Sequence, residues 1–208
     1  MVKMFIDGGI FMWPILGLFI IGLMFALERL WTLSRASIST RKFMDTIKKA
    51  LSEGNAEEAM TICSKTRGPI ASIFSAGLMR VNRGIEAVEK SIVAAGTVEM
   101  AFLEKNLIWF STIIAMAPML GFTGTVWGMI AAFDAIKNAN DISPSIVAGG
   151  ISQALLTTLF GLIVAMIIQI FNNYFISRID KLVIEMEESS VDFIDTLAAM
   201  EAEKVKKQ

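Results

Sequence analysis

Six polar side chains lie close together in sequence within two long apolar stretches, and their types could do chemistry there. They are Thr123, Thr125, Ser152, Gln153, Thr157 and Thr158. A polar group in lipid costs free energy unless a partner satisfies it. A hydroxyl can bond the carbonyl one turn back in its own helix, which for a single threonine is the commoner arrangement. Six polar groups together, one of them an amide, instead favour a shared polar interface or a hydrated pathway.

Other kinds of chemistry are excluded by composition. Histidine is absent, which removes Ser-His and Cys-His nucleophilic catalysis, histidine-ligated metals and histidine proton relays. Cys63 is the single cysteine, so there is neither an internal disulfide framework nor a CxxC metal site, and its ordinary role is that of a small buried apolar residue. No carboxylate lies inside the apolar stretches. We therefore expect no enzyme, no catalytic residue, no metal site and no cofactor, and the net charge of −1 gives no basic footprint for nucleic acid.

The elements that position the six polar residues are long uncharged runs. The chain has 208 residues, 54% of them hydrophobic and 19% charged, against about 45–50% and 25% in soluble domains. Three runs lack any charge over 20, 27 and 36 residues: Gly8–Leu27, Leu107–Phe133 and Ile142–Ser177. Since about 18 such residues suffice to cross a bilayer, we predict an all-α membrane protein with transmembrane helices at residues 8–27, 107–133 and 144–177. The alternative for the first run, a cleaved signal peptide, is disfavoured by its length and by the lack of an A-x-A-like site.

Basic residues predict the orientation of these helices. Of the 19 Lys and Arg, 12 lie between Leu27 and Leu107 and five follow Ser177, while Lys3 and Lys137 stand alone on the two other flanks. Because basic residues concentrate on the cytoplasmic side, residues 28–106 and the tail 178–208 are predicted to be cytoplasmic. The N-terminus, residues 1–7, and the turn at residues 134–143 are then periplasmic, and membrane lipids surround the spans.

Both cytoplasmic segments have helical spacing. Apolar residues recur at intervals of three and four in residues 70–78, 85–95 and 179–200. Nothing in the pattern interrupts the chain between Gly84 and Leu107, so we predict one helix that runs straight into the second span. The tail is predicted to continue the third span in the same way.

Small residues follow one face of each of the last two spans. In the second span they are Ala117, Gly121, Thr125, Gly128 and Ala132, and in the third Gly150, Ala154, Thr157, Gly161 and Ala165. Gly124 and Gly128 also form a G-x-x-x-G pair, which lets helix backbones approach closely. We expect Gly121, Gly124, Gly128 and Gly161 to pack helices together. Three helices cannot enclose an aqueous path and shield it from lipid, so a transport function would require oligomers or a partner.

Two motifs carry a resemblance to a known family. The residues Pro118–Met129, PMLGFTGTVWGM, resemble the P-x-L-G-L-x-G-T-V-W-G-M signature of the TolQ/ExbB branch of the MotA/TolQ/ExbB proton-channel family. The stretch that begins at Gly150, GISQALLTT, is similar to that branch's G-I-A-E-A-L-x-x-T, and Glu28-Arg29-Leu30 at the end of the first span is also typical. The similarity covers nearly the whole chain.

The resemblance implies a homo-oligomer, usually a pentamer, in the bacterial inner membrane. It would surround the transmembrane helices of a small single-span partner of the TolR/ExbD type, which supplies an aspartate, and ion flow would energise transport or mechanical work at the cell envelope. On the family pattern Thr125 and Thr158 face the pore, and we place Gln153 and Thr157 with them on the ion pathway.

Position 153 departs from the family pattern, because Gln stands where Glu is usual. An amide has no useful titration, so Gln153 cannot relay protons, although it could hydrogen-bond or help hold a sodium ion. The coupling ion, proton or sodium, therefore stays open. So does the alternative of a non-conducting membrane scaffold with the same fold.

Overall fold

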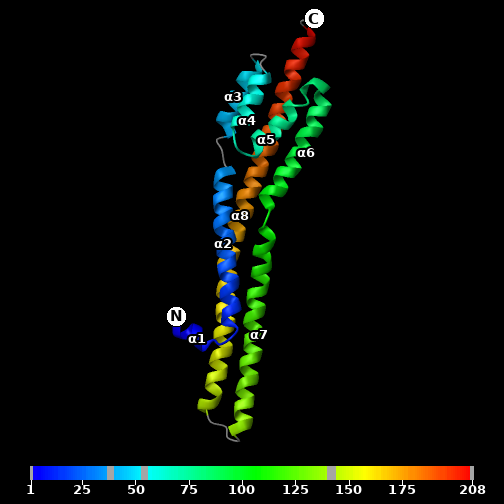
Figure 1. Ribbon diagram of the computed structural model, residues 1–208. Coiled ribbons are helices and arrows are strands. Elements are labelled where there is room, and N and C mark those ends of the chain that lie inside the picture. Colours follow the sequence, from blue (N-terminus) through cyan, green and yellow to red (C-terminus); the bar gives the residue numbers. More distant parts are fainter. Residues whose placement is uncertain (1, 37–39, 53–55, 140–143, 207–208) are drawn as a thin grey trace. The chain divides into compact units, whose positions relative to one another are not determined.

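The computed structural model describes residues 2–36, 40–52, 56–139 and 144–206, and the elements assigned there are helices joined by turns. In chain order they are α1 (Val2–Asp7), α2 (Met12–Ala36), α3 (Thr40–Ser52), α4 (Ala56–Lys65), α5 (Pro69–Leu78), the short 3₁₀ helix η1 (Val81–Arg83), α6 (Ile85–Glu104), α7 (Leu107–Ala139) and α8 (Pro144–Lys206). The predicted all-α class is confirmed (Figure 1).

The chain divides into two compact units. Unit 1 contains Met1–Arg29 and Asn106–Phe175, and unit 2 contains Leu30–Lys105 and Ile176–Gln208. The helices α2 and α8 each contribute to both units, since the divisions at residues 29/30 and 175/176 fall inside them.

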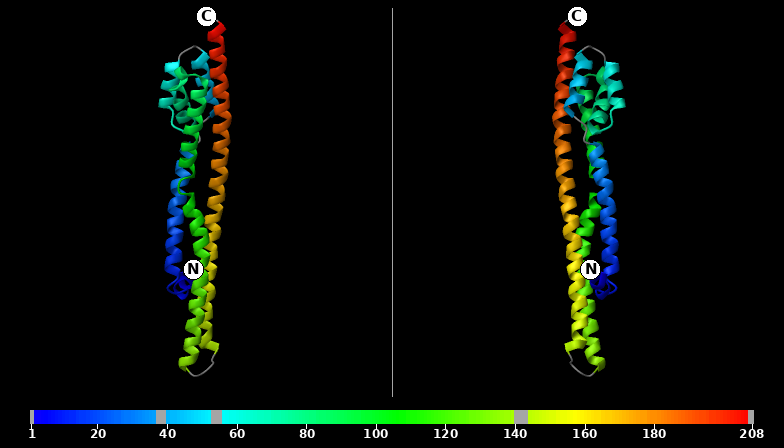
Figure 2. Two further views of the ribbon diagram at one scale, coloured as in Figure 1. Left: turned by 90° about the vertical axis from the view of Figure 1, so that its right-hand side faces the viewer. Right: turned by 90° about the vertical axis from the view of Figure 1, so that its left-hand side faces the viewer.

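Unit 1 is built from α1, most of α2, α7 and the first half of α8. Both views of Figure 2 show α7 and α8 running side by side in this unit. Three stretches of the described chain are long and apolar enough to cross a membrane: Met12–Ser34, Ile85–Asn138 and Val147–Met200. The predicted number of three candidate spans is thus confirmed by length and composition, while the predicted bounds of the spans stay predictions. Large apolar side chains cover their outer faces, among them Phe122 and Ile170, which are 67% and 70% exposed.

The prediction of one helix from Gly84 into the second span is wrong. The structure ends α6 at Glu104 and begins α7 at Leu107. Lys105 is extended (φ −50°, ψ 138°), and Asn106 adopts a left-handed conformation with φ 68°. Asparagine tolerates this conformation better than most residues with a side chain. Apolar spacing on either side of a two-residue interruption still looks helical, so the pattern could not reveal the break.

The tail meets its prediction, because α8 continues without interruption from Pro144 to Lys206. The helix α7 extends to Ala139, beyond the uncharged run that ends at Phe133. Of the predicted outer turn at residues 134–143, residues 140–143 lie outside the described chain. The sidedness of every segment stays a prediction.

Unit 2 has a core of stacked aromatic rings. Phe74 of α5 is fully buried, and its ring stacks on Phe193 of α8 at a centroid distance of 4.2 Å and an interplanar angle of 10°. Phe43 of α3 lies on the same cluster, 5.8 Å from Phe74. The helical spacing identified the buried faces here: Ile70, Ile73, Phe74, Gly77 and Leu78 in α5, and Ile179, Leu182, Met186, Phe193 and Leu197 in α8.

Candidate functional site

The helices α7 and α8 meet backbone to backbone along their glycines. A Cβ atom built on Gly161 would lie 2.5 Å from the carbonyl oxygen of Ala117, and one on Gly121 would lie 2.9 Å from the carbonyl oxygen of Thr157. A Cβ on Gly128 would lie 2.9 Å from the carbonyl oxygen of Gly150. Real Cβ atoms do not approach backbone so closely, so these three positions have room only for glycine. Close approach of this kind is how small residues join helices in membranes.

The close approach brings two hydroxyls together across the helix pair. Thr125 Oγ1 of α7 and Thr158 Oγ1 of α8 form a hydrogen bond with each other. Thr125 Oγ1 also lies 3.1 Å from the carbonyl oxygen of Ala154 and 3.2 Å from that of Gly121, and Thr158 Oγ1 lies 3.2 Å from the same Gly121 oxygen. Both threonines are half-buried. Each hydroxyl carries one proton and two lone pairs. The pair can therefore donate two hydrogen bonds in total, and the available acceptors are the two hydroxyl oxygens and two carbonyl oxygens.

The other polar residues of these helices have different partners. Thr157 is fully buried, and its hydroxyl donates to Ala154 of its own helix at 2.8 Å. Its side chain fills the space over Gly124, where a Cβ would lie 2.6 Å from Thr157 Oγ1. Thr123 is exposed and donates to Met119 in its own helix at 2.8 Å. For these two hydroxyls the own-helix bond is the one that the structure shows.

Gln153 lies against the N-terminal segment and not against the threonine pair. A Cβ built on Gly9 would lie 2.2 Å from Gln153 Nε2. Of the four residues expected on the ion pathway, Thr125 and Thr158 form a hydroxyl pair, Thr157 shares the Ala154 carbonyl with Thr125, and Gln153 lies apart against Gly9. Conduction by any of the four stays a prediction.

Sequence reasoning missed two participants. The Ala154 carbonyl accepts hydrogen bonds from both Thr125 and Thr157, yet a backbone acceptor leaves no trace in residue types. Gly9 was not singled out, although the doublet Gly8-Gly9 is the kind of turn signal that precedes a helix.

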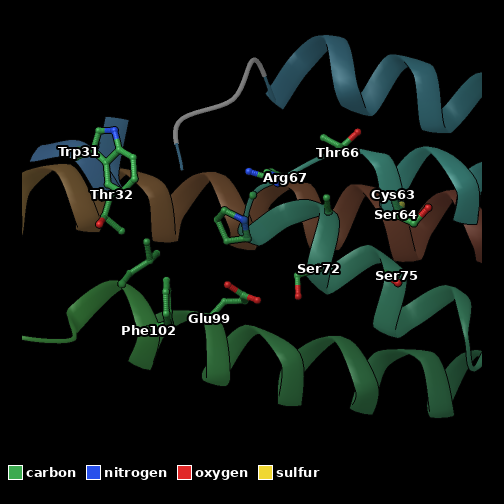
Figure 3. Close-up of a pocket in the computed structure, with 14 residues that line it drawn as sticks. Trp31, Thr32, Cys63, Ser64, Thr66, Arg67, Ser72, Ser75, Glu99 and Phe102 are labelled. Carbon is green, nitrogen blue, oxygen red and sulfur yellow. The ribbon is translucent and has the colours of Figure 1, made fainter. Parts of the chain in front are cut away.

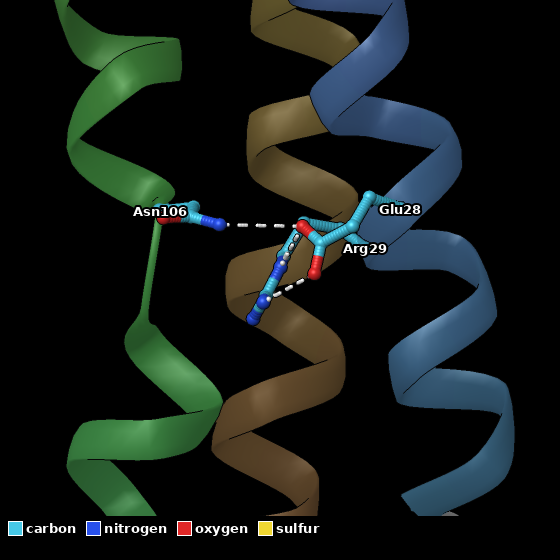
Figure 4. A network of polar contacts seen from close by, with 3 residues as sticks. All are labelled: Glu28, Arg29 and Asn106. Atoms are coloured by element: carbon cyan, nitrogen blue, oxygen red, sulfur yellow. Dashed lines mark hydrogen bonds and ion pairs between the residues drawn. The ribbon is translucent and has the colours of Figure 1, made fainter.

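A second polar cluster lies at the other end of unit 1. Glu28 and Arg29 of α2 form a two-pronged ion pair, with Nη2 to Oε1 at 2.9 Å and Nε to Oε2 at 3.0 Å (Figure 4). Asn106, at the break between α6 and α7, donates from Nδ2 to Glu28 Oε2 at 3.4 Å. Arg29 is only 1% exposed, and a buried guanidinium needs a carboxylate partner of this kind. The residues that resembled the family at the end of the first span thus link α2 to the start of α7.

Unit 2 has an open cavity of about 600 Å³ between α5, α6 and the end of α2. Figure 3 shows Ser72 and Glu99 extending into the space between α5 and α6. Trp31, Arg67 and Ser72 on its wall are exposed, so it is a surface groove. Its charged lining residues are Arg67 and Glu99. Cys63 also lines it but is 3% exposed, and burial raises the pKa of its thiol to about 11.

Three apolar helices, two of them joined through glycines and hydroxyls, define a polytopic helical membrane protein. A model of the MotA/TolQ/ExbB proton channel family matches residues 65–188, more than half of the chain. The chain belongs to this family.

Curated relatives agree with this assignment. A protein of Methanothermobacter thermautotrophicus, named as an ExbB homolog of biopolymer transport, is 34% identical over 179 residues, which are 86% of this chain and 63% of that protein. An ExbB-like protein of Synechocystis is 27% identical over 81% of both chains. The Tol-Pal system protein TolQ of Pseudomonas aeruginosa is 30% identical over 55% of this chain and 54% of its own length. This chain thus spans less than two thirds of the first of these relatives.

Proposed function

We propose that the chain is the channel-forming subunit of an ion-driven motor in a bacterial inner membrane, conducting protons to energise transport or mechanical work at the cell envelope. The observation that carries the proposal is the hydroxyl pair of Thr125 and Thr158. Both threonines are half-buried in the single chain, and we propose that a group from outside the chain reaches their hydroxyls. Family membership supplies the function class.

The working assembly we propose is a homo-oligomer, most simply a pentamer, around a single-span TolR/ExbD-like partner. The partner brings the carboxylate that this chain lacks between residues 107 and 133 and between 142 and 177. A hydroxyl of the pair can turn its proton from a carbonyl toward that carboxylate, because a hydrogen bond to a charged acceptor is stronger than one to a neutral acceptor. The N-terminus is periplasmic and the tail cytoplasmic in this arrangement.

Valine substitutions test the proposal, since valine keeps the shape of threonine and removes both hydrogen-bonding capacities. We expect Thr125→Val and Thr158→Val each to lower proton flux, measured with a pH-sensitive dye in proteoliposomes that hold the complex with its co-purified partner. Because both act on one carboxylate, the double variant should lose much less than the sum of the two. Thr123→Val is the matched control: Thr123 lies on the same helix, is exposed, bonds only its own helix in the described contacts, and should leave flux unchanged.

The second candidate is a scaffold of the same fold that conducts nothing. It is favoured by one observation: both hydroxyls of the pair are satisfied within this chain. Two results together would establish the scaffold and end the channel proposal. The double valine variant would support the same activity in cells as the wild type, and neither protein would give a flux above that of protein-free liposomes. Flux that responds to an imposed sodium gradient and not to a proton gradient would instead show that sodium is the coupling ion.

A further inference from the structure

The corner between α1 and α2 is a tight reversal centred on Gly9. The amide of Gly9 donates to Ile6 at 3.2 Å to finish α1, and its carbonyl accepts from Met12 at 3.2 Å to begin α2. Gly9 has φ +74°, a left-handed conformation that glycine adopts without strain. Its backbone therefore serves both helices, and its position sets where α1 can lie.

The end of the Gln153 side chain occupies the space where Gly9 lacks a Cβ. A Cβ built on Gly9 would lie 2.2 Å from Nε2, 2.9 Å from Cδ and 3.5 Å from Cγ of Gln153. Glycine thus suits position 9 in two ways: its backbone angle is left-handed, and the end of the Gln153 side chain would have to move to admit any Cβ. The contact lies wholly within unit 1.

Other residues of the corner are packed as well. Met12 and Ile15 are each 1% exposed. Phe11 lies 6.2 Å from the ring of Trp127 in α7, so the corner touches both helices of the glycine-packed pair. Phe5 of α1 meets Trp13 of α2 edge to face at 5.4 Å, which holds α1 back against α2. The corner is therefore docked on α7 and α8 and not only tethered to α2.

Gln153 points away from the hydroxyl pair. Thr158 follows it by five residues, which at about 100° per residue places the two side chains roughly 140° apart around the helix. Thr158 reaches Thr125 and Gly121, whereas Gln153 reaches Gly9. An amide suits a contact with a backbone turn inside or beside lipid, because it brings no charge to be desolvated.

We propose that Gln153 is a positioning residue that seats the α1–α2 corner on α8 and takes no part in conduction. The exchange of the family's usual Glu for Gln then places a neutral amide at this contact, and the ion passes at the threonine pair alone. The statement about conduction rests on the proposed channel function, but the docking does not.

A cross-linking experiment tests the docking by itself. In a Cys63→Ala chain, Phe11→Cys and Trp127→Cys create a thiol pair across the corner, which a short bis-maleimide joins when the corner is docked. Gly9→Ala should lower the cross-linked fraction about tenfold, because the new methyl group meets the Gln153 side chain and alanine is strained at φ +74°. Adding Gln153→Ala should recover part of that loss, since it removes the atoms that the new methyl group meets, while the strain of an alanine at φ +74° remains. Gly17→Ala is the matched control, because nothing lies within 4 Å of a Cβ at Gly17.

Failure of Gln153→Ala to recover any cross-linking, or an equal loss in Gly17→Ala, would overturn the docking. A second variant, Gln153→Met, tests the conduction statement, because methionine fills a similar volume with a flexible apolar end. We expect wild-type cross-linking and wild-type proton flux in proteoliposomes. Normal cross-linking with lost flux would place Gln153 on the ion pathway and overturn the proposal. If the wild-type protein itself shows no flux, the channel function fails, and the cross-linking still decides the docking.

Discussion

Units 1 and 2 hold their helices together by opposite means. In unit 1, α7 and α8 touch through Gly121, Gly128 and Gly161, with backbone against backbone. In unit 2, α5 and α8 are separated by the stacked rings of Phe74 and Phe193. Unit 2 also carries 16 of the 19 Lys and Arg, 11 in residues 30–105 and five in residues 176–208.

The difference follows from the solvent that each composition suits. Lipid tails are as apolar as leucine, so helices in a bilayer gain little from burying large side chains and depend on close contact and hydrogen bonds. In water, the burial of aromatic area is itself the driving force. A consequence for function is that two threonine hydroxyls can bridge α7 and α8 only where glycines allow the backbones to meet. The candidate site of unit 1 therefore depends on the same glycine contacts that pack α7 against α8.

The largest effect that would test this comparison is expected in the core of unit 2. Phe74→Ala removes a fully buried ring that contacts both Phe43 and Phe193, and such truncations cost about 3–5 kcal/mol. Amide hydrogen exchange of α5 and α6 in the purified protein should show lost protection. Met79→Ala removes a side chain that is 69% exposed and should leave the exchange unchanged. Equal protection in both variants would show that the rings do not hold unit 2 together.

A smaller effect is expected in unit 1, where replacing glycine by alanine should change stability in opposite directions at two positions. Alanine is favoured over glycine in a helix by about 1 kcal/mol, so Gly17→Ala should be neutral or stabilising. Gly161→Ala places a methyl group 2.5 Å from the Ala117 carbonyl oxygen, and overpacking typically costs about 1–3 kcal/mol. Heating each variant in detergent and following the loss of its folded band on native gels measures the contrast. A Gly161→Ala protein as stable as Gly17→Ala would mean that α7 and α8 can separate without loss.

The sequence predicted the regular features of this fold and missed the singular ones. Periodicity identified the buried face of the α8 tail, because apolar side chains at intervals of three and four need a common neighbour whatever the fold. The break at Asn106 escaped, since it depends on one backbone angle and on the Glu28 carboxylate 78 residues earlier in the chain.

The candidate site was predictable to a similar degree. The family pattern singled out Thr125 and Thr158, and the structure brings their hydroxyls together. Gln153 was grouped with them because it stands where the family pattern usually has Glu. Its neighbour Gly9 is 144 residues away in the sequence. No spacing rule predicts a contact between the side chain of Gln153 and a glycine, which has no side chain.

The smallest effect concerns Cys63, whose thiol reports whether the interior of unit 2 excludes water. Burial raises its pKa from 9.0 to about 11, because the thiolate is disfavoured away from water. Alkylation requires the thiolate, so native protein at pH 9 should react with iodoacetamide far more slowly than protein unfolded in guanidinium. Mass spectrometry of the modified chain measures both rates. Native and unfolded rates that are equal would show that water reaches the thiol freely.

The same pKa predicts the direction of a change in stability with pH. Below pH 9 the thiol is protonated in both the folded and the unfolded chain, and its contribution does not vary. Between pH 9 and about 11 the unfolded chain releases the proton while the folded chain keeps it, so the unfolded state binds fewer protons and stability falls as the pH rises. Other groups titrate in this range too, and the difference from Cys63→Ala isolates the thiol. Protection of unit 2 should therefore decline more steeply above pH 9 in the wild type than in Cys63→Ala, and parallel curves would mean that the thiol is hydrated in the folded chain.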